Sequence, residues 1–103
     1  MREQERVKIF VKRHNLEAKP EFRLLDMASE LGEVAKELLI ASKYGKSECL
    51  YTENIKRELG DLLFSLICLA NTCNVDLDEA LDMVLKGYEE RMAKKQLKGK
   101  SEG

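Results

Sequence analysis

The sequence predicts an all-α protein, a four-helix bundle formed by one domain and assembling as a homo-oligomer. Three observations support this class. The 103 residues include one proline and no tryptophan. Apolar residues recur every three or four positions, which is the spacing of one helix face. The stretch 62–70 is apolar on every side except at Ser65, as is typical of a helix buried all round. We expect the domain at 1–95 and a flexible basic tail at 96–103.

The first helix is expected over residues 2–14. Val7, Phe10, Val11 and His14 share one face at i, i+3, i+4 and i+7. His14 is the only histidine, and we expect it at a helix end or on the surface rather than as a metal ligand.

The second helix is expected over residues 20–44. Pro20 suits the first helical turn, and Gly45 is typical of the position just past a helix end. The face expected to be buried consists of Leu24, Ala28, Leu31, Ala35, Leu38 and Leu39. A neighbouring acidic stripe consists of Asp26, Glu30, Glu33 and Glu37.

A connecting loop is expected at 45–51, and Thr52 is a good N-cap for a third helix that reaches about Cys73. This helix is too apolar around its circumference for three neighbours in one chain to cover it. We therefore expect a dimer or tetramer. The expected interface draws on Leu62, Leu63, Leu66, Ile67 and Leu69.

The fourth helix is expected to begin after Asp76 and to reach about Lys95. The segment Asp76-Leu77-Asp78-Glu79 has the pattern of a capping box. The face expected to be buried consists of Leu77, Ala80, Leu81, Val84, Leu85, Tyr88 and Met92.

The composition argues against several classes of protein. Eighteen basic and nineteen acidic residues give a net charge of -1, which leaves no electrostatic footprint for nucleic acid. Three cysteines without a C-x-x-C pair favour a reducing cytosol over a disulfide framework or a zinc site. The longest apolar run, 62–70, is far short of the roughly 20 residues that span a bilayer. We expect a cytoplasmic protein that binds neither nucleic acid nor membranes.

Two acidic pairs provide the main functional signal. Glu58 and Asp61 lie three residues apart, on one helix face, beside the most apolar stretch of the chain. The same pattern occurs upstream as Glu30-Leu-Gly-Glu33, and each pair encloses a glycine that would permit close backbone approach. We expect the four acids to form one divalent-metal site. The alternative is that they are exposed acids on amphipathic helices.

Carboxylate ligands favour magnesium, with manganese as a substitute, over zinc or copper. Two unit charges 4 Å apart repel by about 4 kcal/mol at an effective dielectric constant of 20, so clustered carboxylates need a cation. Magnesium is usually bound by a few carboxylates, waters and substrate phosphates. The pattern therefore indicates phosphate chemistry.

Glu30-x-x-Glu33 followed by Glu58-x-x-Asp61 resembles the signature of MazG-like nucleotide pyrophosphohydrolases, in the superfamily of all-α nucleoside triphosphate pyrophosphatases. The resemblance covers most of residues 5–92 and includes the contexts of both acidic pairs and the segment 74–81. It implies magnesium-assisted hydrolysis of a nucleoside triphosphate to a monophosphate and pyrophosphate. In this reading Glu30, Glu33, Glu58 and Asp61 hold the metal and take part in catalysis, with one of them as general base. Candidate cations for the pyrophosphate are Lys36, Lys43, Lys46, Arg57, Lys86 and Arg91.

The chain departs from the family pattern on the last helix. Many relatives carry an asparagine and a lysine ahead of an aromatic residue and an arginine. Here Tyr88 and Arg91 match the second pair, whereas Leu85 and Gly87 occupy the places of the first. Two alternatives stay open: phosphoribosyl-ATP pyrophosphohydrolase, whose histidine after the second acidic pair is absent here, and a non-catalytic helical interaction module.

Overall fold

The computed structural model describes residues 1–48 and 52–102, and in these ranges all regular secondary structure is helical. The four helices are α1 (Arg2–Arg13), α2 (Pro20–Ala41), α3 (Glu53–Thr72) and α4 (Leu77–Glu102). The prediction of an all-α chain with four helices is confirmed. No helix in the described part is long and apolar enough to cross a membrane. The cytoplasmic location stays a prediction, and Cys49 lies outside the described residues.

Two of the expected helix starts are confirmed by their hydrogen bonds. The backbone N–H of Ile55 donates to Thr52 Oγ1 at 3.4 Å, so Thr52 caps α3. Asp76 Oδ1 accepts the backbone N–H groups of Asp78 at 2.8 Å and Glu79 at 3.3 Å, which caps α4 in the same way.

Two helix ends differ from the sequence-based expectation. α2 ends at Ala41 rather than near Tyr44, because Lys43 and Tyr44 have positive φ angles of 50° and 58° that do not continue a right-handed helix. α4 continues to Glu102, past the expected end near Lys95. Most residues of this segment, such as Gln96, Leu97 and Lys98, are good helix formers, which favours the longer helix despite Gly99.

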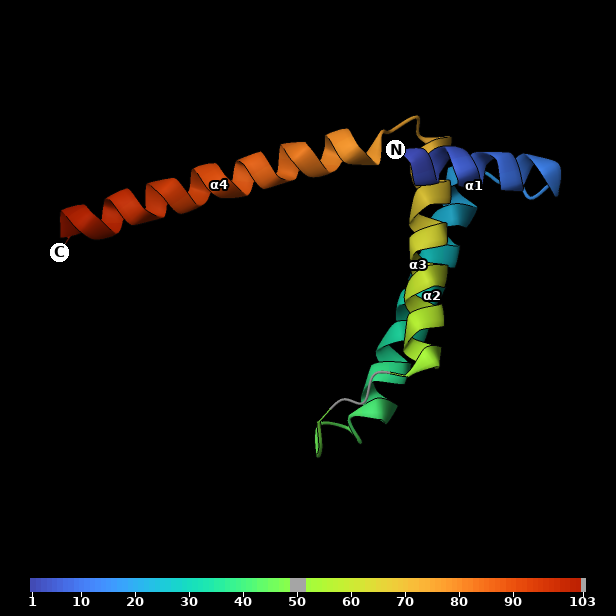
Figure 1. Ribbon diagram of the computed structural model, residues 1–103, viewed down its shortest axis with the longest axis horizontal. Coiled ribbons are helices and arrows are strands. Elements are labelled where there is room, and N and C mark those ends of the chain that lie inside the picture. Colours follow the sequence, from blue (N-terminus) through green and yellow to red (C-terminus); the bar gives the residue numbers. More distant parts are fainter. Residues whose placement is uncertain (49–51, 103) are drawn as a thin grey trace.

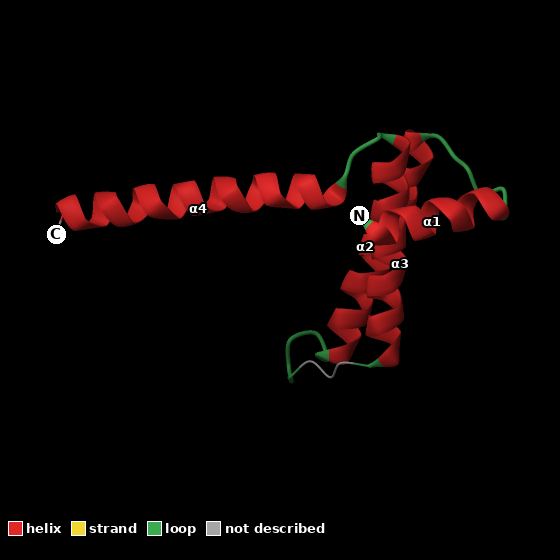
Figure 2. Cartoon of the chain, turned by 45° about the horizontal axis from the view of Figure 1, so that its top comes forward, coloured by secondary structure: helices red, strands yellow, loops and turns green. Residues whose placement is uncertain are grey.

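α2 and α3 lie side by side along their length, and α1 crosses the end of this hairpin near the C-terminus of α3 (Figures 1 and 2). The Phe10 ring of α1 meets the Phe64 ring of α3 edge to face, with centroids 6.1 Å apart. The buried apolar residues lie on α2 and α3: Val34, Ile55, Ile67, Cys68 and Ala70. His14 is exposed at the end of α1, as expected.

α4 extends away from the other three helices (Figure 1). The radius of gyration is 18.4 Å, against about 13 Å for a compact chain of this length. The prediction that one face of α4 is buried is therefore wrong within a single chain. The residues of that face are 41–57% exposed: Leu81, Val84, Leu85, Tyr88 and Met92.

The expected apolar face of α2 is also exposed, with Leu24, Leu31 and Leu38 between 38% and 58% accessible. The reason is the orientation of the helix, which turns a different side toward α3. That side carries Val34, which is buried, and Glu30, which is half-buried. The side of α2 that carries Glu30, and not the expected apolar face with its leucines, therefore borders the interface with α3.

Candidate metal centre

Three of the four expected acids meet between α2 and α3. One carboxylate oxygen each from Glu30, Glu58 and Asp61 lies within 4.8 Å of the others. Glu30 comes from the side of α2 that borders α3, and the other two lie one turn apart near the N-terminal half of α3. Glu30 and Glu58 are half-buried and Asp61 is exposed, so the cluster opens to solvent on one side.

Glu33 lies outside this tight group. It is exposed, although its charge still acts on Glu58. Residues three positions apart on a helix point about 60° away from each other, so Glu30 borders α3 while Glu33 points more to solvent. The expectation of a four-carboxylate cluster is met by three residues at short range, with the fourth at its edge.

The crowding of negative charge in the cluster changes the pKa of Glu58. Partial burial of this carboxylate, followed by the charges of Asp61, Glu33 and Glu30, raises its pKa above the ordinary value of 4.5. Glu37, one turn further along α2, adds to the same effect. Negative charge is therefore crowded at this position, and no described cation lowers the pKa of Glu58 in return.

The glycines within the two acidic motifs do not mark a close approach of backbones. A Cβ atom built on Gly32 or Gly60 would meet nothing within 4 Å. That expectation is wrong, because the acids meet through their side chains while the glycines lie on open parts of the helix surfaces.

None of the six candidate cations forms an ion pair with the cluster. Two ion pairs of the described residues join the Met1 amino group to Asp76 at 3.7 Å and to Asp78 at 3.6 Å. α4, which carries Lys86 and Arg91, projects away from the hairpin that holds the three clustered acids (Figure 2). The Arg91 guanidinium lies over the Tyr88 ring, 4.7 Å from its centroid. The other candidates, Lys36, Lys43, Lys46 and Arg57, are exposed.

The residues present fit a hard divalent cation. All three close donors are carboxylate oxygens, the ligands preferred by magnesium and manganese. The cluster is half-buried and lacks a cationic side chain, so a bound cation would relieve the repulsion that acts on Glu58. Its open side leaves coordination positions for water or phosphate oxygens.

Sequence reasoning missed two buried polar residues that lie outside the acidic cluster, Gln4 and Arg23. Gln4 is 7% exposed and binds the connection between α3 and α4. Arg23 is also 7% exposed and lies beside Cys68, whose pKa is raised by burial. Both residues lie in charged stretches whose sequence resembles that of exposed helices. The sequence therefore gives no signal that their side chains are buried.

Fold and site together define an all-α protein with a carboxylate cluster between two antiparallel helices. A family model described as the MazG nucleotide pyrophosphohydrolase domain matches residues 18–95. The chain therefore belongs to the MazG nucleotide pyrophosphohydrolase family.

Individual relatives agree with this assignment. The uncharacterized protein YpjD of Bacillus subtilis (strain 168) is 40% identical over 68 residues, which are 63% of this chain and 60% of that protein. The crystal structure of a Bacillus-conserved MazG protein, a nucleotide pyrophosphohydrolase, has a TM-score of 0.69 at 30% identity, over 82% of this chain and 83% of that one. The crystal structure of the putative pyrophosphatase YpjD from Bacillus subtilis has a TM-score of 0.68 at 30% identity, over 82% and 86%.

Proposed function

We propose that this protein hydrolyses a nucleoside triphosphate to a nucleoside monophosphate and pyrophosphate with the help of magnesium, and that it removes nucleotides from the cellular pool. The observation that carries the proposal is the meeting of Glu30, Glu58 and Asp61 from two helices of a MazG domain. Manganese would serve as a substitute because it accepts the same oxygen ligands.

The reaction places a water oxygen on the α-phosphorus, and the bond from that phosphorus to the oxygen bridging it to the β-phosphorus breaks. When bound, the metal supplies charge stabilisation on the phosphate oxygens and a lowered pKa for a bound water. Glu30, Glu58 and Asp61 would hold it, and Glu33 at the edge of the cluster would add to the negative charge that attracts it. One carboxylate of this group accepts the proton that leaves the attacking water, and the pyrophosphate departs with the electron pair of the broken bond.

The candidate cations for the leaving pyrophosphate differ in how close they lie to the acidic residues along the sequence. Arg57 precedes Glu58 directly, and Lys36 follows Glu33 by one turn. Both have long side chains that can turn toward an arriving phosphate. Lys43 and Lys46 lie in the turn after α2, at the far end of the helix. Lys86 and Arg91 would take part only if a second copy of the chain brought its α4 to the site.

We also propose that the chain works as a homo-oligomer. An isolated helix is marginally stable in water, yet α4 carries a continuous apolar face that its own chain leaves exposed. The hairpin exposes leucines as well, including Leu31 on α2 and Leu66 on α3. A second copy of the chain carries the same two surfaces, the apolar face of α4 and the exposed leucines of the hairpin. In a symmetric assembly each copy would cover the exposed apolar residues of the other. Leu63 and Leu66 are exposed and remain candidates for the interface, whereas Ile67, 2% exposed, is part of the core.

The decisive experiment is pyrophosphate release from a panel of ribonucleoside and deoxyribonucleoside triphosphates, with magnesium and with chelator. We expect release with magnesium only, and loss of at least a hundred-fold in Glu58→Gln and Asp61→Asn with the helical circular dichroism unchanged. The matched control is Glu89→Gln, an exposed acid on α4. Absence of hydrolysis for every nucleotide, together with no stabilisation by magnesium, would support the non-catalytic module instead.

A further inference from the structure

α4 carries its charged side chains in two blocks of opposite sign. Residues 77–90 contain five acids and one lysine, whereas residues 91–98 contain four cations and no acid. The acids are Asp78, Glu79, Asp82, Glu89 and Glu90, and the four cations are Arg91, Lys94, Lys95 and Lys98. Because the helix runs from Leu77 to Glu102, the boundary lies near its middle. The N-terminal half of α4 is therefore negative, and the part that follows it is positive.

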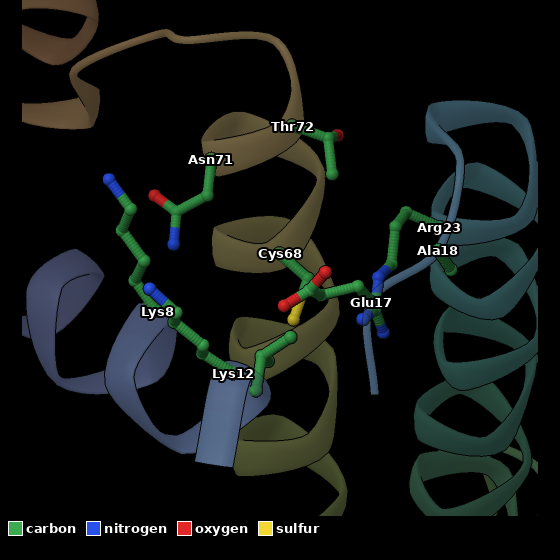
Figure 3. Close-up of a pocket in the computed structure, with 9 residues that line it drawn as sticks. Lys8, Lys12, Glu17, Ala18, Arg23, Cys68, Asn71 and Thr72 are labelled. Carbon is green, nitrogen blue, oxygen red and sulfur yellow. The ribbon is translucent and has the colours of Figure 1, made fainter. Parts of the chain in front are cut away.

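Four apolar residues on one side of α4 have the spacing of a coiled-coil seam. Leu81, Leu85, Tyr88 and Met92 follow one another at steps of four, three and four. These side chains are 49–57% exposed. α4 extends away from the hairpin, and the pocket between α1 and α3 is lined by residues of α1, α2, α3 and the loop at 14–19 (Figures 1 and 3). The seam therefore remains accessible to a second helix.

The same spacing, extended by one step of three in each direction, reaches Asp78 and Lys95. The seam thus has an acid at its N-terminal end and a base at its C-terminal end, with the apolar residues between them. The Asp78 side chain is 62% exposed, although its carboxylate lies 3.6 Å from the Met1 amino group. Lys95 is exposed as well, so both ends of the seam are accessible to a group on a second chain.

We propose that this seam pairs with the same seam of a second copy of the chain, with the two α4 helices antiparallel. In such a pair each seam residue lies opposite the partner residue at the mirrored position. The resulting layers are Leu81 with the partner's Met92, Leu85 with the partner's Tyr88, and Asp78 with the partner's Lys95. The inference rests on the homo-oligomer of the proposed function, but it requires neither metal nor hydrolysis.

The charges favour the antiparallel direction over the parallel one. In a parallel pair Asp78 would face the partner's Asp78 and Lys95 the partner's Lys95, and like charges in direct opposition repel. In the antiparallel pair opposite charges meet at both ends, and the negative half of each helix lies along the positive part of the other. Asp82 and Glu89 then share one edge of the pair, where solvent and salt screen their repulsion.

The first test reverses the charges at the ends of the seam and measures self-association by sedimentation equilibrium. Asp78→Lys and Lys95→Asp should each raise the dissociation constant by at least ten-fold, because each places like charges opposite one another twice in every dimer. The double variant exchanges the two charges, so its dissociation constant should return to within about three-fold of the wild-type value. In a parallel pair the double variant would rescue nothing, which would overturn the inference.

Glu79→Lys and Lys94→Asp are the matched controls. They make the same changes of charge on the side of α4 that faces away from the seam. Glu79 lies next to Asp78 in the first turn, so its variant also shows what a cation at the N-terminus of the helix costs. Both control variants should keep a dissociation constant within about three-fold of the wild type, with unchanged helical circular dichroism.

A second test identifies the partner surface directly. Asp78 and Lys95 lie 17 residues apart on one helix, about 25 Å at 1.5 Å per residue, so a direct amide bond between them forms only between two chains. Carbodiimide coupling of mixed 15N-labelled and unlabelled protein should therefore join these residues in peptide pairs with one labelled member. Coupling of Lys95 to acids of α2 or α3 instead would show that the hairpin covers α4, and would overturn the inference.

The outcomes separate this inference from the proposed function. An oligomer whose dissociation constant responds to neither charge reversal would overturn the α4 pairing and leave the proposed homo-oligomer standing. A wild type that is monomeric at every concentration would overturn both. Pyrophosphate release by such a monomer would still leave the proposed reaction intact.

Discussion

Gln4 and Asn71 exchange hydrogen bonds across the end of the hairpin. The Gln4 side-chain amide donates to Asn71 Oδ1 at 3.1 Å, and the Asn71 amide donates to the Gln4 backbone carbonyl at 3.0 Å. The same Gln4 side chain binds the Val75 carbonyl and the Leu77 N–H, each at 2.8 Å. One side chain from α1 thereby fixes the segment from which α4 departs.

Replacing Gln4 with alanine should destabilise the fold by about 1–3 kcal/mol, because it leaves the Leu77 N–H and the Val75 carbonyl without their partner. Urea unfolding followed by circular dichroism measures this change. Gln96→Ala, on the exposed surface of α4, is the control and should alter stability by less than about 0.5 kcal/mol. Equal effects of the two substitutions would show that the Gln4 bonds contribute nothing.

The metal-free protein should become more stable as the pH falls through the raised pKa of Glu58 toward the ordinary carboxyl value of 4.5. The pKa of Glu58 is raised in the folded state, so its contribution to stability is present at low pH and is lost as the pH rises through the folded pKa. Thermal unfolding in chelator measures the trend, and Glu58→Gln should flatten it while Glu89→Gln should not. A contribution of Glu58 that lowers the melting temperature as the pH falls toward 4.5, judged against Glu58→Gln, would contradict the crowding of these carboxylates.

Asp76 should make the protein less stable as the pH falls, which is opposite to the effect of Glu58. Hydrogen bonds from the backbone N–H groups of Glu79 and Asp78, together with the Met1 amino group, lower its pKa below 3.8. The stability that it contributes is present above 3.8 and is lost as the pH falls through its folded pKa. Asp76→Asn should therefore reduce the loss of helicity seen below about pH 3.8, as measured by circular dichroism, whereas the exposed Asp82→Asn should leave that loss unaltered.

Magnesium should stabilise the wild type, by about 2.7 kcal/mol at a concentration one hundred times its dissociation constant. Glu30→Gln, Glu58→Gln and Asp61→Asn should remove this effect, because each deletes one of the three close carboxylates. Glu33→Gln should weaken it less, since its carboxylate lies outside the tight group. Melting curves with and without magnesium give the comparison, and Glu89→Gln is the control. A loss in Glu33→Gln as complete as in Glu58→Gln would place Glu33 among the direct ligands.

Leu85→Arg should shift the protein toward monomers, because it puts a charge in the exposed apolar face of α4. Met83 lies on the opposite side of the same helix and is 71% exposed, so Met83→Arg is a matched control that should keep the wild-type mass. Leu66→Arg tests the α3 surface in the same way. Size-exclusion chromatography with light scattering measures the mass, and unaltered masses in both leucine variants would exclude these surfaces as interfaces.

The sequence by itself determined where the helices lie along the chain and which acidic residues share a helix face. Thr52 and Asp76 capped their helices as their residue types predict, since an N-cap depends only on a side chain and the next three backbone N–H groups. The repeated acidic pairs were likewise evident, because spacing of three residues fixes a shared helix face.

Only the tertiary structure decided which face of each helix is covered. Helical periodicity places Leu31 on the apolar side of α2, but α2 instead turns Glu30 and Val34 toward α3. The rotation of one helix against another depends on the side chains of both, and α4 departs in a direction that Gln4, distant in sequence, holds. Such long-range contacts leave no periodic signal in the segments that they arrange.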